Sequence, residues 1–212
     1  MVRSSLRVAL ICLLSISTAS ATWQIPDVLI FEGKEYSIFN ELLEPYFKKY
    51  PERNPKDEDY RCSANWRGYK AIFEVSNGEI VLKDIFKNAC DRSTVSEMKK
   101  AVPDGMPLKI GWYSGVLTSM NGKNPGDSYS IEFLYSFEKY SMFEVDKGRL
   151  TAVKHFDNKG FLDFRAEQFE KYKKTEEFRE SLKKMTADGK QSIEGAEENI
   201  RIWFPFLLKK FL

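Results

Sequence analysis

Histidine is nearly absent from this chain, whose 212 residues include one, His155. Zinc sites built from several imidazoles are therefore excluded, and no cluster of cysteines takes their place. A Ser-His-Asp triad would have to use His155, although that residue alternates with Val153 at the end of an expected strand, as an ordinary edge residue would. The G-x-S-x-G, P-loop and G-x-G-x-x-G motifs are also missing. The sequence therefore predicts no catalytic residue, no cofactor and no metal site.

Carboxylates offer one remaining route to catalysis, because acid pairs can cleave glycosidic bonds. Asp84 is the candidate with an argument behind it, since the expected strand register places it on an apolar inner face. A carboxylate there must be paired or protonated, and Arg67 or Lys70 could pair with it. The alternative is a strand end at which Asp84 reaches water.

Long hydrophobic runs are missing too, and the longest, Val8–Ile16, is too short to span a bilayer. Arg3 and Arg7 precede this run, and Ala19-Ser-Ala21 follows it as a small-x-small cleavage site. Residues 1–21 therefore read as a signal peptide cleaved before Thr22, which predicts a secreted or periplasmic protein. The alternative is a buried N-terminal strand.

Excess charge of one sign is lacking once that segment is removed. The whole chain has 33 basic and 31 acidic residues, and loss of Arg3 and Arg7 leaves 31 of each. A neutral chain has no overall field that attracts polyanions, so nucleic acid is not expected as a partner.

Cysteine is scarce, and the expected mature chain retains Cys62 and Cys90. An even number of cysteines in an exported protein predicts a disulfide, which would close a loop of about 29 residues and contribute roughly 3–4 kcal/mol. Two buried free thiols are the alternative.

Turn signals are well represented. Glu32-Gly33, Asn77-Gly78 and Lys147-Gly148 each separate two apolar segments, as two-residue hairpin turns do. The Asn-Gly turn also predicts a strand register. It pairs Val75 with Ile80, Phe73 with Leu82, Ala71 with Asp84 and Tyr69 with Phe86.

Helical spacing marks the two ends of the mature chain. Phe39 to Tyr50 repeats apolar residues with Pro45 in a helical first turn, and Asp163 caps an expected helix to Met185. Residues 108–118 read as a strand. We expect one α+β domain over residues 22–212, mainly β over 22–160 and mainly helical over 161–212. Its antiparallel, hairpin-built sheet would carry short N-terminal helices and C-terminal helices packed on it.

Aromatic residues crowd the expected strands. Exposed aromatic and arginine side chains anchor protein partners or stack on sugars, and the candidate binding residues are Trp66, Arg67, Tyr69, Trp112 and Tyr113. Arg67 could also form a cation–π contact with its aromatic neighbours. The alternative is that these aromatic residues fill the core. The apolar C-terminal tail, with Lys209 and Lys210, either closes the core or touches a membrane surface or partner.

Three passages carry a resemblance: Leu43-Glu-Pro-Tyr-Phe47, Trp66-Arg-Gly-Tyr-x-Ala-x-Phe-Glu-Val75 leading to Leu82-Lys-Asp-Ile85, and Lys109–Val116. They resemble a group of small exported bacterial proteins of unassigned activity. The resemblance covers about residues 27–153, and after residue 117 the chain departs from the pattern. It implies no catalytic residues.

The expected function is therefore that of an exported, non-catalytic binding protein, such as a periplasmic inhibitor or immunity-type partner of another protein. Two alternatives remain open: a hydrolase that uses carboxylates or His155, and a binder of small ligands or glycans through exposed Trp and Tyr side chains.

Overall fold

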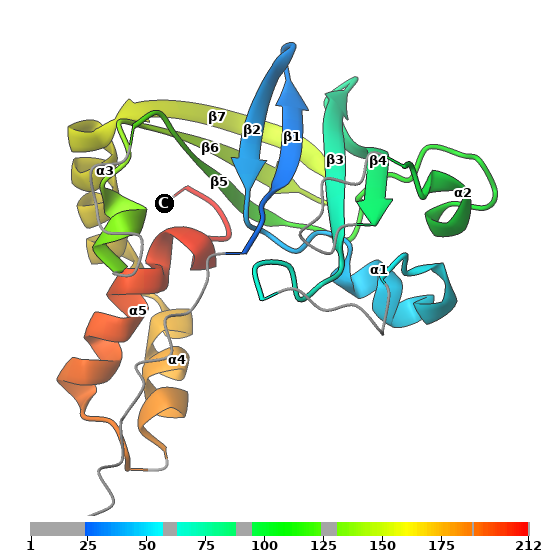
Figure 1. Ribbon diagram of the computed structural model, residues 1–212. Helices are drawn as coiled ribbons and strands as arrows, with labels where there is room; N and C mark the ends of the chain where they lie inside the picture. The colour runs from blue at the N-terminus through cyan, green and yellow to red at the C-terminus, as the bar shows by residue number, and fades with distance from the viewer. Residues whose placement is uncertain (1–23, 57–62, 88–94, 124–130, 188, 212) are drawn as a thin grey trace, which may run out of the picture.

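The computed structural model describes residues 24–56, 63–87, 95–123, 131–187 and 189–211. The strands are β1 (Asp27–Phe31), β2 (Lys34–Ile38), β3 (Tyr69–Ser76), β4 (Glu79–Lys87), β5 (Gly115–Asn121), β6 (Lys139–Asp146) and β7 (Arg149–Asp157). They form a closed barrel in the order β1-β2-β5-β6-β7-β4-β3 (Figure 1). The expected fold, an antiparallel, hairpin-built sheet with helices packed on it, is therefore wrong, because the sheet closes on itself and β1 pairs with β3 in parallel.

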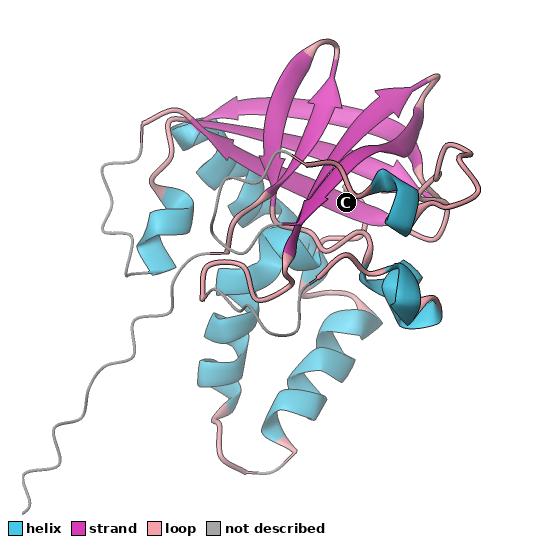
Figure 2. Cartoon of the chain, turned by 45° about the vertical axis from the view of Figure 1, so that its right-hand side comes forward, coloured by secondary structure: helices cyan, strands magenta, loops and turns pink. Residues whose placement is uncertain are grey.

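Helices lie on two sides of this barrel (Figures 1 and 2). The short helices α1 (Glu44–Lys49) and α2 (Met98–Ala101) lie beside the β3–β4 hairpin. The longer helices α3 (Asn158–Tyr172), α4 (Glu176–Thr186) and α5 (Ile193–Leu207) gather on the other side. Two 3₁₀ turns complete the described elements, η1 (Pro51–Arg53) and η2 (Ile131–Tyr135).

All three predicted hairpin turns are confirmed. In each turn both central residues have positive φ, for example 52° at Asn77 and 76° at Gly78. This is the type I′ geometry that matches the twist of paired strands and that glycine adopts without strain. The three hairpins β1–β2, β3–β4 and β6–β7 therefore follow from local sequence.

Closure of the barrel depends on pairings that are distant in sequence. β1 runs parallel to β3, with Leu29 opposite Phe73. β2 meets β5 where Ile38 pairs with Ser119, and β4 meets β7 at the turn ends of both strands. Turn chemistry specifies only neighbours within a hairpin, so the sequence predicted the hairpins and not their closure.

The predicted register of the β3–β4 hairpin is correct near the turn and wrong beyond it. Leu82 pairs with Phe73 as expected, but the register shifts there, and Ala71 faces Ile85 instead of Asp84. Lys83 is the additional residue, so the structure has a β-bulge at this position. Since an extra residue reverses which side chains face inward, Asp84 turns outward and accepts a hydrogen bond from the Ser96 hydroxyl at 2.6 Å.

The predicted strand over residues 108–118 is wrong in its first half. β5 begins at Gly115. The preceding segment lies along the outer edge of β4, where the N–H of Leu82 donates to Leu108 O and that of Ile110 donates to Ile80 O, each at 2.9 Å. These bonds cover an otherwise open strand edge.

The predicted C-terminal helix is divided in two. α3 starts earlier than expected because the Asp157 side chain, and not Asp163, caps it by accepting the Gly160 N–H at 2.7 Å. Thr175 begins α4 by accepting the Phe178 N–H at 3.2 Å. Side-chain acceptors at these positions satisfy N–H groups that the first turn of a helix leaves unpaired.

Two apolar clusters organise the interior. One fills the barrel around Leu29, Phe73 and Phe143, and the other lies between the barrel wall and α3–α5. The C-terminal tail contributes buried Phe204 and Leu208 to the second cluster, which confirms core closure for that part of the tail. None of the helices in the described ranges is long and apolar enough to cross a membrane.

Candidate functional site

An aromatic surface with a defined hollow lies between α1 and the loop that follows α2. The hollow has a volume of about 490 Å³. We call it the aromatic groove, and its lining consists of Pro45, Tyr46, Lys49, Tyr50, Arg53, Val102, Asp104, Met106, Pro107, Leu108 and Trp112. Sequence spacing places Tyr46 and Tyr50 four residues apart, and Pro45 is accommodated in the first turn of α1 as predicted.

Trp112 is held in a fixed position although 40% of it is exposed. Its indole N–H donates to Leu42 O at 2.8 Å. Its ring stacks on Tyr46, with centroids 5.7 Å apart and planes 12° apart. A partner that covers this ring would therefore immobilise little additional side chain, which lowers the entropic cost of binding.

Tyr46 links the walls of the aromatic groove. Its hydroxyl donates to Ala101 O at the end of α2 and accepts from the Arg53 guanidinium, both at 2.8 Å. Arg53 in turn lies over the Tyr50 ring, 4.6 Å from its centroid. Helix α1, the η1 turn and helix α2 are thus joined at one hydroxyl group.

Charged side chains lie on the two helices beside the aromatic groove. Lys48 and Lys49 end α1, and Lys99 and Lys100 lie in the last turn of α2. The acidic groups near Arg53 are Glu52 and Asp104, whose carboxylates lie 3.7 and 3.6 Å from its guanidinium. Of these charged groups, Lys49, Arg53 and Asp104 line the groove itself.

The structure separates the five candidate binding residues. Trp112 lies in the aromatic groove, and Trp66 is 61% exposed elsewhere. Tyr113 is half-buried and accepts a hydrogen bond from the Asn40 amide at 3.1 Å, and burial raises its pKa to about 12. Arg67 and Tyr69 are buried.

Arg67 acts inside the fold. Its guanidinium donates to the Asp27 carboxylate at 2.8 Å and to Ile25 O at 3.0 Å, and it lies 5.2 Å from the Tyr69 ring centroid. Burial raises the pKa of Asp27 to about 6, while Arg67 and the Ala71 N–H lower it. The predicted cation–π contact thus exists with Tyr69, but in the interior of the protein.

The remaining groove residues were not identified from sequence. Tyr46 and Tyr50 belong to a helical repeat of apolar residues, and such a repeat is equally typical of residues that pack in a core. Tyr46 is in fact buried except where it lines the groove. Met106, 71% exposed, lies in a loop without any pattern. The sequence signal for the site was Trp112 beside Tyr113, because the partners of Trp112, Leu42 and Tyr46, lie about 70 residues away in sequence.

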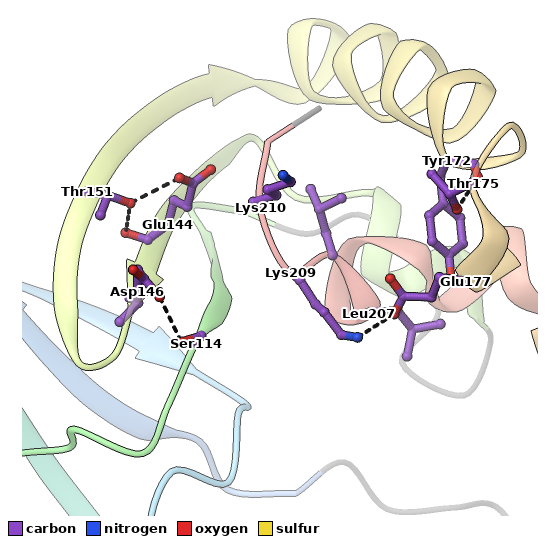
Figure 3. A pocket seen from close by; sticks show the side chains of 12 residues that line it. Ser114, Glu144, Asp146, Thr151, Tyr172, Thr175, Glu177, Leu207, Lys209 and Lys210 are labelled. Atoms are coloured by element: carbon purple, nitrogen blue, oxygen red, sulfur yellow. Dashed lines mark hydrogen bonds and ion pairs between the residues drawn. The ribbon is translucent and has the colours of Figure 1, made fainter.

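A second hollow, of about 570 Å³, lies between the barrel and the C-terminal helices (Figure 3). Its polar side chains pair among themselves: Thr151 with Glu144, Ser114 with Asp146, and Lys209 with Glu177. The N–H of Phe211 also donates to Glu144 at 2.6 Å. Because these polar groups bond the C-terminal tail to β6 and α4, we interpret this hollow as the place where the tail is attached to the rest of the protein.

The residues proposed for hydrolysis do not converge. Asp84 lies on the outside of β4, bonded to Ser96. The His155 ring lies 2.9 Å from the Ser141 hydroxyl through Nδ1, and within the described residues no carboxylate is bonded to the ring. In that same part of the chain, no group of three His, Cys, Asp or Glu side chains is placed to hold a metal ion.

The predicted Cys62–Cys90 disulfide, like the signal peptide, lies outside the described residues. No family model, curated protein or solved structure matches this chain. The resemblance to small exported bacterial proteins therefore stays an expectation. The fold and the site together define a closed barrel with flanking helices and an aromatic groove on its surface.

Proposed function

We propose that this chain is an exported, non-catalytic binding protein whose aromatic groove holds an acidic segment of a partner protein, as an inhibitor or immunity-type protein would. The observation that carries this proposal is Trp112, which is exposed and fixed from two sides by Leu42 and Tyr46. Tryptophan, tyrosine and arginine are the residues on which binding energy concentrates at protein interfaces.

Charge supports an acidic partner. Two cations, Lys49 and Arg53, line the aromatic groove against one acid, Asp104. Acidic residues on a partner would be attracted to them, which raises the rate of association and selects against basic partners. An apolar or aromatic residue of the same segment would then cover Trp112 and Met106.

The test uses a labelled acidic peptide with a central phenylalanine, and a second peptide in which lysines replace its acids. We expect the acidic peptide to bind at least tenfold more tightly and to lose affinity as salt rises. Trp112→Ala should weaken its binding at least tenfold. Trp203→Ala is the matched control, because Trp203 is 44% exposed on α5 and lies outside the groove.

The same variants test the partner in its natural setting. Quantitative capture from an envelope extract should retain one protein on the wild-type chain and on Trp203→Ala and lose it on Trp112→Ala. Equal binding of both peptides, or identical captures by Trp112→Ala and the wild-type chain, would contradict the proposal. Export is part of the proposal because it determines which extract contains the partner, and it is supported by the N-terminal sequence.

A further inference from the structure

Strand β7 has a long edge that no other described strand covers. On one side it pairs with β6 along its whole length, and on the other it meets β4 only where Glu79 pairs with Arg149. Figure 1 shows β7 as the outermost strand of the group β5, β6 and β7. In the described ranges, no group outside β6 is hydrogen-bonded to the backbone of residues 152–156. We call this stretch the free edge.

The exposure of β7 agrees with this edge position. None of its nine residues is buried, whereas most residues of the neighbouring strand β6 are. Alternate residues of an edge strand direct their N–H and C=O groups outward, in a row that matches another extended backbone. The free edge is also about as long as an ordinary strand, roughly five to six residues. The edge itself therefore indicates an extended polypeptide as its occupant.

Two other strand edges of the barrel are covered by irregular segments of the chain. Residues 108–110 cover β4, and the C-terminal tail covers β5, where the N–H of Val116 donates to Leu208 O at 3.0 Å. Edge strands without a cover are usually protected by proline, by bulges or by lysine. The bulge of β7 lies near its turn, outside the free edge. The ammonium of Lys154 points to the outer face of the strand, 4.8 Å from the ring centroids of Phe164 and Phe211.

An open hollow of about 610 Å³ adjoins the free edge at the end of the barrel. We call it the barrel mouth, and its lining consists of Lys34, Glu35, Tyr36, Asn121, Glu138, Lys139, Tyr140, Ser141, His155, Phe156 and Asp157. Its three carboxylates outnumber its two lysines, so the lining favours a basic side chain. The Tyr36 and His155 rings lie 6.2 Å apart and 23° from parallel. Flat rings of this kind suit a guanidinium group, which stacks on aromatic faces.

A second copy of this chain is the less suitable occupant of the free edge. Two identical strands pair about a two-fold axis. Pairing centred on Lys154, the middle residue of the free edge, would place two lysines directly opposite each other, which destabilises a sheet. Pairing centred nearer either end of β7 is cut short, by α3 at one end and by β4 at the other. A strand of different sequence avoids both difficulties.

We propose that the free edge of β7 binds an extended segment of a partner protein as an additional strand, with an arginine of that segment in the barrel mouth. Main-chain hydrogen bonds to alternate residues of the free edge hold the segment. The arginine side chain lies against Tyr36 and His155 and meets the carboxylates of the lining. This site is independent of the aromatic groove, because the two hollows share no residue.

Amide hydrogen exchange of the full chain tests both the edge and its occupant. In the chain alone, the outward amides of residues 152–156 should exchange at least tenfold faster than the amides of β7 that bond to β6. The probe is an eight-residue peptide of alternating valine and threonine with one central arginine. At saturation it should slow the outward amides at least tenfold. The same peptide with every backbone nitrogen methylated should not bind, because it has no main-chain donors.

Side-chain changes test the barrel mouth. A peptide with glutamate in place of arginine should bind at least tenfold more weakly than the arginine peptide. Glu35→Gln with Glu138→Gln should weaken binding of the arginine peptide at least threefold and leave binding of a glutamine peptide unchanged. Glu180→Gln with Glu194→Gln is the matched control, because these residues lie on α4 and α5, outside the hollow.

Four results would overturn the proposal. The first is that the outward amides of the free edge are already protected in the chain alone, and the second is that this protection arises from self-association of the chain. The third is equal binding of the methylated and unmethylated peptides. The fourth is equal affinity for the arginine and glutamate peptides.

Discussion

The guanidinium of Arg67 lies 2.8 Å from the carboxylate of Asp27, and the two side chains are 3% and 0% exposed. Asp27 also accepts the Ala71 N–H at 2.8 Å. One carboxylate therefore joins the start of β1 to the segment that leads into β3, at the parallel pairing that closes the barrel. Because each charged atom has a partner, the pair is tolerated in the interior.

The stability of the protein should depend on pH through Asp27. Burial raises the pKa of this group from 3.8 to about 6, so the folded chain binds a proton at Asp27 more readily than the unfolded chain does. The resulting stabilisation is complete below about pH 4 and is lost as the pH rises through about 6.

Urea unfolding at pH 7.5 and pH 5 measures this effect. The free energy of unfolding of the wild-type chain should rise towards pH 5 relative to that of Asp27→Asn, by about 1.4 kcal/mol. The comparison with Asp27→Asn removes the opposite contribution of exposed acids such as Glu79, whose pKa is lowered by Lys109. Parallel pH curves for the two proteins would contradict the prediction.

Gly148 should be far less replaceable than Gly33. Both have positive φ, 77° and 71°, so alanine is strained at either position, by about 1 kcal/mol. At Gly148 a Cβ would also lie 2.7 Å from Ile110 O, whereas at Gly33 it would meet nothing within 4 Å. We expect Gly148→Ala to lower the free energy of unfolding by at least 1 kcal/mol more than Gly33→Ala. Equal urea midpoints of the two variants would show that the turn moves freely away from Ile110.

Tyr46→Phe should destabilise the aromatic groove. The change removes the donor to Ala101 O and the acceptor for Arg53, at a cost of about 1–3 kcal/mol. Arg53 should then leave its position over Tyr50 and weaken binding of the acidic peptide. Tyr50→Phe is the control, because within the described residues the Tyr50 hydroxyl forms no side-chain hydrogen bond. Urea unfolding and peptide titration measure both effects, and equal results for the two variants would count against the role of Tyr46.

Export should leave two marks on the native product. Intact mass should correspond to a chain that starts at Thr22, and Cys62 and Cys90 should resist alkylation until a reductant is added. Reduction should lower the free energy of unfolding by roughly 3–4 kcal/mol. A product that retains Met1, or in which both thiols react at once, would contradict both export and the disulfide.

Trp112 illustrates how far the sequence reaches towards the candidate site. It stood out as one of several aromatic residues on expected strands, but it lies in a loop and its stacking partner Tyr46 belongs to α1. Arg67 and Tyr69 were candidates on the same grounds, as an arginine and an aromatic residue near expected strands, but both are buried in the structure. Composition could nominate these residues, but only the surroundings of each decide whether it is exposed.

Local sequence determined the three hairpins, because positive φ at the two central residues of each turn is a property of the turn residues themselves. The tertiary structure decided the rest. The parallel pairing of β1 with β3 and the bulge at Lys83, which turns Asp84 outward, depend on packing between segments that no local preference brings together.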